Sequence, residues 1–364
     1  MRTIWLVTAL LAACTDGMNP VEYPGGAGGS DGPGGTGGGG TVGGGTGGGG
    51  TVGGGTGGNQ GAAVPDVRCA GVPDAGPARD FRHLKSELIA ALGDAKHRGI
   101  DLVTSVAAAT QKLEGWISYT VADKALEDED VELFACVGGA WTALGTARTD
   151  DEGYFALPLS GAARLAIGVR DLFVSVVGDR TGARFLGYVA PEGTRLILSD
   201  VDGTLTSSEN AFFETILLGT EPDARPGAAR AYSAATLRNY QLVYMTARGS
   251  QYTSETRTWL AHQSFPRGPL RLAASFITLP GGDTVDYKTR TAQALADAGL
   301  ELAAGVGNRA SDITAYSNAG IAADRIFIEL PEFADEVQAP NAAGNAIGFP
   351  SYDELRTAHL EKLP

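Results

Sequence analysis

Two carboxylates, Asp200 and Asp202, lie two residues apart in a stretch that continues into Gly203. The largely apolar run 195–199 directly before them has the composition of a short buried strand. A strand that ends in a glycine turn can direct both side chains into one pocket. There the first carboxylate can act as a nucleophile and the second as a proton donor, while a divalent metal ion screens their repulsion. The spacing therefore predicts covalent catalysis at a strand end.

Further polar groups of the right chemistry follow later in the chain. Thr246 ends an apolar run, Lys288 opens a predicted helix after two acidic residues, and Asp312 comes shortly after a later strand-like run. A hydroxyl and an ammonium group can bind the oxygens of a transferring phosphoryl group. A further carboxylate can complete an oxygen-rich magnesium site. Together these residue types favour phosphoryl transfer.

The elements that must position these groups alternate between strand and helix from residue 194 onward. Apolar runs predict strands at 196–199, 242–245, 275–279, 303–307 and 325–329, and helical periodicity predicts helices at 228–237 and 287–298. Such alternation implies an α/β fold with a parallel sheet, and a site at the carboxyl ends of its strands.

This ordered set of motifs resembles the haloacid-dehalogenase (HAD) superfamily of phosphatases and, more narrowly, the lipin-type phosphatidate phosphatase domain. The narrower likeness rests on residues 198–206, 244–248 and 307–316. It also rests on residues 259–260 together with 265–270, which are similar to that family's segment after the second motif. It covers about residues 195–329. The resemblance implies a HAD-like Rossmannoid sheet with helices on both faces, beside an immunoglobulin-like domain.

The resemblance also implies a role for each polar group. Asp200 would attack phosphorus and become an aspartyl phosphate, and Asp202 would protonate the leaving alcohol and then activate water. The other implied roles are phosphate binding by Thr246, Lys288 and the backbone N–H groups at Gly203, Mg²⁺ binding by the Asp200 and Asp312 carboxylates and the Asp202 main-chain carbonyl, and support by Asn308 and Arg248.

Structural roles stay open for several of these residues. Thr246 and Asp312 can each cap a helix N-terminus, and Lys288 can be a solvated helical lysine. Arg248 either contacts a lipid headgroup or pairs with an acidic neighbour. The chain also lacks the polybasic stretch of lipin-type enzymes and has no N-terminal domain matching theirs beyond the strand-rich region, which leaves the lipid substrate open.

The leading hypothesis is a Mg²⁺-dependent phosphatase that converts phosphatidate to diacylglycerol at a membrane surface. One alternative is a phosphatase of small soluble phosphomonoesters. Another is a non-catalytic phosphatidate-binding module, because related lipin-like domains of phosphatidylinositol-transfer proteins lack the first carboxylate. Asp200 is present here, which favours turnover.

The region before the α/β pattern has short strand-like runs separated by turn signals. Strands are predicted at 116–119, 131–134, 147–149, 154–157 and 172–177. They predict a small all-β sandwich of immunoglobulin or transthyretin type at residues 111–192, with a structural role. Residues 64–110 are predicted to be a helical segment with an amphipathic helix at 77–92, which either packs onto the neighbouring domain or contacts lipid. Residues 193–364 form the predicted phosphatase domain.

The N-terminus has the features of an export signal. Residues 1–13 combine a positive start, an apolar core and small residues before Cys14. This resembles a bacterial lipobox, so a lipid anchor on Cys14 is expected, with an ordinary secretory signal as the alternative. The glycine-rich stretch within 14–63 predicts a disordered tether. The protein is therefore expected at a bacterial membrane, on the periplasmic or cell-surface side.

Charge and cysteine content limit the other possibilities. The net charge of −14, from 28 basic and 42 acidic residues, argues against nucleic-acid binding. Beyond Cys14 the chain has only Cys69 and Cys136, which either form a disulfide in an oxidising compartment or stay unpaired. No cysteine or histidine spacing matches a zinc site.

Overall fold

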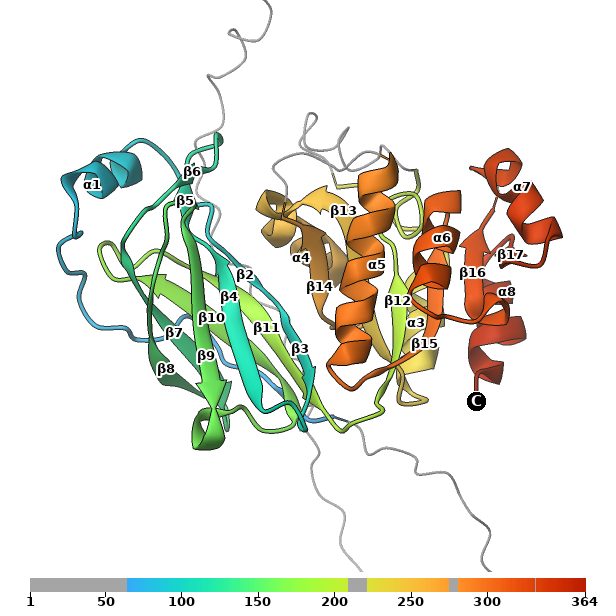
Figure 1. Cartoon of the computed structure of the whole chain (residues 1–364), viewed down its shortest axis with the longest axis horizontal. Helices are drawn as coiled ribbons and strands as arrows, with labels where there is room; N and C mark the ends of the chain where they lie inside the picture. Colours follow the sequence, from blue (N-terminus) through green and yellow to red (C-terminus); the bar gives the residue numbers. More distant parts are fainter. Residues whose placement is uncertain (1–63, 209–220, 275–280, 331) are drawn as a thin grey trace, which may run out of the picture. The chain divides into compact units, whose positions relative to one another are not determined.

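The computed structural model describes residues 64–364 apart from 209–220, 275–280 and 331. The predicted signal peptide, Cys14, the tether and the predicted strand 275–279 lie outside these residues. Within the described ranges, no helix is both long and apolar enough to cross a bilayer. Figure 1 shows a β-sandwich that is followed along the chain by an α/β domain.

The sandwich consists of two sheets and a short hairpin. The larger sheet contains β3 (Leu102–Ser105), β11 (Gly182–Ala190), β10 (Gly168–Val176), β7 (Asp130–Val137) and β8 (Ala140–Arg148) in this order, with β1 (Asp66–Val67) beside β10. The smaller sheet contains β2 (Arg98–Ile100), β4 (Thr110–Trp116) and β9 (Tyr154–Ser160), and β5 (Ser118–Tyr119) pairs with β6 (Lys124–Ala125). Leu113 and Phe155 of the smaller sheet share one buried core with Leu133 and Phe185 of the larger. The predicted all-β sandwich is confirmed.

The sandwich begins earlier than predicted. Strands β2 and β3 lie in the segment 64–110 that was expected to be helical, and its helix α1 covers only Leu84–Ala91. The difference arises because β2 pairs with β4 and β3 pairs with β11, and such partners are not visible in a local pattern. In the predicted amphipathic helix Ile89 is buried, but Leu88 and Leu92 are 59% and 76% exposed.

Strand β11 does not follow from the sequence pattern either, because it begins at a glycine. A Cβ atom at Gly182 would lie 2.3 Å from the Phe173 ring and 2.3 Å from the Val174 carbonyl oxygen. The close approach of β10 therefore requires glycine at a position where glycine weakens strand propensity.

A disulfide joins Cys69 to Cys136 on β7, across 67 residues of sequence. The pairing alternative is therefore confirmed. Closing a loop of this length restricts the unfolded chain, and native disulfides typically stabilise by about 2–4 kcal/mol. We expect the double variant Cys69→Ser/Cys136→Ser to lose about this much unfolding free energy in urea titrations.

Reduction of the unchanged protein provides the matched control for this prediction. Dithiothreitol should lower its urea midpoint to that of the double variant and should leave the variant unchanged. Equal midpoints for the oxidised and reduced protein would contradict a stabilising disulfide.

The α/β domain is built on a parallel sheet. In the described residues its strands follow the order β14 (Leu270–Ala273), β13 (Gln241–Gly249), β12 (Arg195–Ser199), β15 (Glu301–Gly307), β16 (Ile326–Glu329) and β17 (Ile347–Phe349). The chain leaves β12 toward β13 on one side and later returns to β15 on the other. Strand β12 thus lies where the strand order reverses, the place where open α/β sheets bind ligands.

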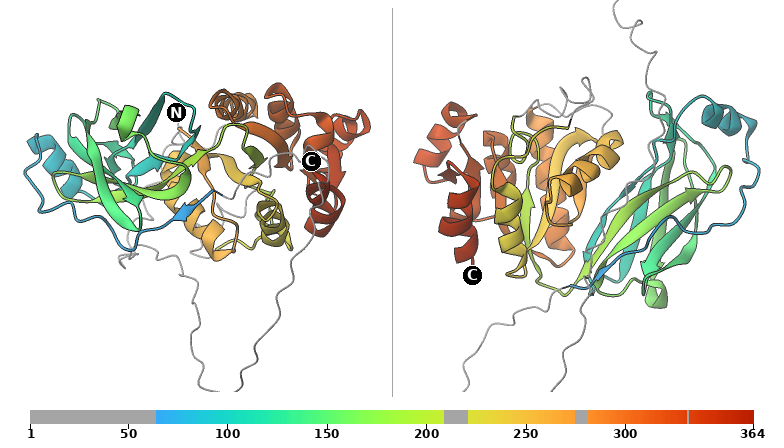
Figure 2. Two further views of the ribbon diagram at one scale, coloured as in Figure 1. Left: turned by 90° about the horizontal axis from the view of Figure 1, so that it is seen from below. Right: turned by 180° about the vertical axis from the view of Figure 1, so that it is seen from behind.

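Helices cover both faces of this sheet, as the opposite views in Figures 1 and 2 show. The helices are α3 (Ala228–Thr236), α4 (Thr253–His262), α5 (Gly281–Asp297), α6 (Ala310–Asn318), α7 (Ala334–Ala342) and α8 (Tyr352–Glu354). Ile197 of β12 belongs to the buried cluster that contains residues of α3 and α4, whereas Leu198 belongs to the cluster with residues of α5 and α6. Successive strand residues thus face opposite layers. The predicted fold class is confirmed.

Candidate active site

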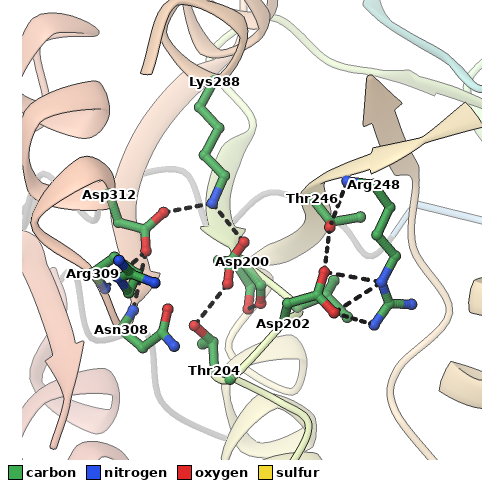
Figure 3. A network of polar contacts seen from close by, with 12 residues as sticks. Asp200, Asp202, Thr204, Thr246, Arg248, Lys288, Asn308, Arg309 and Asp312 are labelled. Carbon is green, nitrogen blue, oxygen red and sulfur yellow. Dashed lines mark hydrogen bonds and ion pairs between the residues drawn. The ribbon is translucent and has the colours of Figure 1, made fainter. Parts of the chain in front are cut away.

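The candidate site lies where β12, β13 and β15 end. These strands are neighbours in the parallel sheet, with β12 in the middle. Asp200 directly follows β12, Thr246 lies in the second half of β13, and Asn308 directly follows β15. Figure 3 shows these residues gathered at one edge, together with Lys288 and Asp312 from two helices. The residues predicted from four separate stretches of sequence are therefore brought together.

The carboxylate of Asp200 is oriented from two directions. It accepts hydrogen bonds from Lys288 Nζ at 2.5 Å and from Thr204 Oγ1 at 2.9 Å. Its backbone N–H donates to the Val306 carbonyl oxygen on β15 at 2.9 Å. Asp200 is only 5% exposed, so the carboxylate is fixed before a substrate binds. Sequence reasoning assigned no role to Thr204, although it belongs to the same short motif.

Lys288 links two carboxylates. Its Nζ lies 2.5 Å from Asp200 Oδ1 and 2.6 Å from Asp312 Oδ1, and the residue is 3% exposed. The alternative of a solvated lysine is therefore wrong. Lys288 also does not open a helix as predicted, because α5 already begins at Gly281.

The charge of Lys288 is maintained by its partners. Burial alone would lower the pKa of the ammonium group, but the carboxylates of Asp200 and Asp312 outweigh this and raise the pKa well above its ordinary value. A permanent cation thus stands beside the two carboxylates at neutral pH.

Asp312 combines a helix-capping role with a position in the site. Its Oδ2 accepts hydrogen bonds from the backbone N–H groups of Asn308 and Arg309, each at 3.1 Å, while Oδ1 faces Lys288. Asp312 therefore both caps the helix N-terminus and lies among the other predicted site residues. Gly307 permits this arrangement, because a Cβ atom there would lie 2.5 Å from Asp312 side-chain atoms. Asn308 itself is buried beside Asp312.

The carboxylate of Asp202 is directed toward β13 rather than toward Lys288. Thr246 Oγ1 donates to its Oδ2 at 2.7 Å. Arg248 Nε lies 2.9 Å from each carboxylate oxygen, and Arg248 Nη2 lies 2.5 Å from Oδ1. Of the two roles that the sequence left open for Arg248, the structure shows the pairing with an acidic neighbour. Figure 3 shows the pair beside the Asp200 group.

Two predicted phosphate-binding groups make internal hydrogen bonds. Gly203, with a φ of 69° that glycine tolerates, donates its N–H to Thr206 Oγ1 at 2.8 Å. The Thr246 hydroxyl is bonded to Asp202 and accepts from Arg248 N at 3.2 Å. Thr246 lies inside β13 and caps no helix, so that alternative is wrong. A bound phosphate would exchange these internal bonds for its own.

A further charged group at the same sheet edge was not predicted. Arg225 donates through Nη2 and Nε to the Gly203 carbonyl oxygen at 3.0 and 3.3 Å. It also lies 2.8 Å from Glu332 and 3.4 Å from Glu329, the last residue of β16. Arg225 thus joins the loop that carries Asp200 and Asp202 to the end of β16. The distance in sequence between these partners explains why no local pattern reveals them.

Glu329 should make stability depend on pH. Burial raises the pKa of its carboxyl to about 7, against the opposing effect of Arg225 and with a smaller contribution from Glu332. Because the folded state holds this proton more tightly, the stabilisation is present below the unfolded pKa of about 4.5 and is lost as the pH rises through about 7. When the pH is raised from 5 to 8, the parent protein should lose about 1–3 kcal/mol more unfolding free energy than Glu329→Gln. Parallel urea titrations at both pH values would measure this, and equal losses would contradict the assignment.

The donor set at the site suits a hard divalent cation. The described residues contain no ready-made group of three or more acidic, histidine or cysteine ligands. However, one ammonium nitrogen contacts both Asp200 and Asp312, so their oxygens lie close enough to share one cation. Carboxylate and carbonyl oxygens are the ligands that Mg²⁺ prefers. The residues predicted to bind Mg²⁺ are therefore chemically compatible with it.

Comparisons with known proteins match both parts of the chain. Residues 197–329 match the family model described as "PITM 1-3, LNS2 domain", and residues 95–189 match the model described as "PITM 1-3, beta-sandwich domain". The second match begins close to β2, in agreement with the early start of the sandwich.

Relatives with similar sequences are much longer proteins. Protein retinal degeneration B of Drosophila melanogaster is 27% identical over 238 residues, which are 64% of this chain and 18% of that protein. Human membrane-associated phosphatidylinositol transfer protein 3 is 25% identical over 263 residues, which are 71% of this chain and 26% of that protein. The chain thus spans about a fifth to a quarter of these relatives.

Similar solved structures cover just under half of the chain. The putative beta-phosphoglucomutase of Thermotoga maritima is 13% identical, with a TM-score of 0.35 over 46% of this chain and 100% of that one. The D,D-heptose 1,7-bisphosphate phosphatase of Burkholderia thailandensis is 15% identical, with a TM-score of 0.27 over 46% and 99%. Along the chain, a segment similar to the PITM 1-3 beta-sandwich domain is thus followed by a segment similar to the LNS2 domain.

Proposed function

We propose that this protein is a Mg²⁺-dependent phosphatase that forms an aspartyl phosphate on Asp200 and acts on phosphatidate at a membrane surface. The observation that carries the proposal is the Asp200 carboxylate itself. It is buried at the sheet edge, oriented by Lys288 and Thr204, and lies on the loop that also holds Asp202. A domain that only bound phosphate would have no need of an oriented nucleophile there.

The reaction proceeds in two steps. An Asp200 carboxylate oxygen attacks phosphorus, the bond from phosphorus to the alcohol oxygen breaks, and that oxygen takes a proton from Asp202. Asp202 then removes a proton from water, whose oxygen attacks phosphorus and releases phosphate and the Asp200 carboxylate. Lys288 offers a fixed positive charge to the phosphoryl oxygens in both steps. Arg248 and Thr246 hold Asp202 in position between them.

Mg²⁺ would be held by the carboxylates of Asp200 and Asp312 and the main-chain carbonyl of Asp202, with Asn308 in support. When bound, it would supply positive charge that offsets the charge of the phosphoryl group. The Lys288 ammonium already supplies part of this positive charge, since it contacts the same two carboxylates.

The choice of a phospholipid substrate is supported by the relatives, which are named membrane-associated phosphatidylinositol transfer proteins. A lipid anchor on Cys14, as predicted, would keep the site near such a substrate. The same names favour a second candidate function, a non-catalytic phospholipid-binding module. A phosphatase of soluble esters is the third candidate.

A comparison of substrates with the full chain separates these candidates. Phosphate release would be measured from phosphatidate in mixed micelles and from p-nitrophenyl phosphate, each with Mg²⁺ and with a chelator. We expect Mg²⁺-dependent release from phosphatidate. Release from the soluble ester alone would end the lipid assignment, and micelle binding without any release would establish the binding module instead.

A further inference from the structure

Helix α4 lies between the candidate site and the β-sandwich and contacts both through adjacent residues. Thr256, which is completely buried, accepts a hydrogen bond from Arg248 Nη1 at 2.9 Å. Arg248 holds Asp202 with its Nε and Nη2 atoms. The third guanidinium nitrogen is thus fixed to α4 while the other two face the carboxylate. Thr256 therefore sets the direction from which Arg248 approaches Asp202.

The next residue of the helix, Arg257, is fixed by the sandwich. Its Nη2 lies 2.8 Å from each carboxylate oxygen of Asp101, between β2 and β3. Asp101 is buried, and it also accepts the backbone N–H of Leu270 on β14 and of Leu186 on β11, each at 2.7 Å. One carboxylate thus joins the sandwich, the edge of the parallel sheet and α4.

A second contact reaches the same segment from the sandwich. Arg98 of β2 donates through Nε to Ser250 Oγ at 2.8 Å, two residues after Arg248. Arg98 is held in turn by Asp123, whose two carboxylate oxygens lie 2.7 and 2.8 Å from its Nη1 and Nη2 atoms. The segment from Arg248 to Arg257 is therefore attached to the sandwich at both ends.

We propose that the β-sandwich positions the acid–base carboxylate: Thr256 and Asp101 act, through Arg248 and Arg257, as positioning residues for Asp202. This inference rests on the proposed phosphatase function and assigns a task to a domain that carries no catalytic group. Side chains that are held by several hydrogen bonds suit this task, since a shift of about 1 Å at a reacting group can cost on the order of 100-fold in rate.

The test uses leaving groups that differ in their need for a proton. Nitrophenolate leaves without protonation, whereas the alkoxide of an alkyl phosphate needs the proton that Asp202 supplies. In the full chain, Thr256→Val removes the hydroxyl acceptor and keeps the shape. We expect it to slow the first, phosphorylating step by about 10- to 100-fold for phosphatidate and by less than about 3-fold for p-nitrophenyl phosphate. Single-turnover kinetics would measure both.

Two control variants and one further test variant complete the experiment. Thr256→Ser keeps the hydroxyl and should restore the parent behaviour. Thr258→Val makes the same change two residues along the helix, where the side chain is partly exposed, and should leave both rates unchanged. Arg257→Met removes the contact with Asp101 and should reproduce the leaving-group dependence of Thr256→Val. Equal slowing of both esters by Thr256→Val would overturn the positioning role of Thr256. If Arg257→Met is destabilised but shows no leaving-group dependence, the positioning role of the sandwich is overturned.

A second measurement needs no turnover. If the parent protein releases no phosphate from either ester, the proposed function fails, but the link through Arg248 is still measurable by unfolding. Asp202→Asn and Thr256→Val should then be non-additive in a double-mutant cycle, because both remove partners of the same guanidinium group. Additive effects would refute the link itself.

Discussion

Replacing Asp200 by asparagine is expected to abolish phosphate release. An amide is a very poor nucleophile, and loss of a catalytic nucleophile typically lowers kcat by far more than about 1000-fold. The fold should persist, because the asparagine oxygen can still accept from Lys288 Nζ while its amide N–H donates to the Thr204 hydroxyl oxygen. Initial rates with phosphatidate and Mg²⁺ would measure the loss.

The covalent step can be examined in the same variant. Acid quenching during turnover of a substrate labelled in its phosphoryl group should leave label on the parent protein and none on Asp200→Asn. Asp286→Asn provides a matched control, since Asp286 is exposed on α5 and should not affect either result. Undiminished release from Asp200→Asn would refute the nucleophile and the mechanism with it.

The sequence predicted which residues lie close together where a short motif coincides with a strand end. Asp200 and Asn308 directly follow strands whose apolar runs are continuous, because both faces of the parallel sheet are buried. Once those strands are placed side by side, their ends must meet at one edge. That is why residues more than 40 positions apart, such as Asp202 and Thr246, could be assigned to one site.

The residues that orient the site were not predictable in this way. Arg225 binds the Gly203 carbonyl, and Asp101 binds Arg257 across 156 residues of sequence. Neither contact has a periodic signature, since it depends on which loops the fold brings together. Lys288 was found only through its place in the order of motifs, and its burial between two carboxylates follows from the packing of α5 against α6.

Secondary structure was missed for local reasons. Strand β11 starts at a glycine that close packing requires, and helix α7 contains Pro340, which normally opposes a helix interior. Strand β14 lies at Leu270–Ala273, where no strand was predicted. In each case tertiary contacts outweigh the local preference of the chain.

Replacing Lys288 by methionine is expected to cost both activity and stability. Methionine fills a similar volume but leaves Asp200 and Asp312 facing each other in a buried site without their shared cation. Removing one partner of a buried ion pair typically costs about 3–5 kcal/mol. The raised pKa of Lys288 means that the ammonium is charged throughout the neutral range, so its stabilisation is lost only as the pH rises beyond the ordinary lysine pKa of about 10.5. The loss in Lys288→Met should therefore be fully visible in urea titrations at pH 7.

Lys85→Met is the matched control for this loss. Lys85 pairs with Glu127 at 2.7 Å on the surface, with its side chain 57% exposed, and such pairs contribute less than about 1 kcal/mol.

Mg²⁺ gives a further readout that does not depend on turnover. A cation that binds between Asp200 and Asp312 should raise the urea midpoint of Lys288→Met, because a ligand of the folded state stabilises it, and adding Asp312→Asn should remove this effect. A midpoint that does not respond to Mg²⁺ in Lys288→Met would show that these two carboxylates do not form the cation site, whatever the fate of the phosphatase assignment.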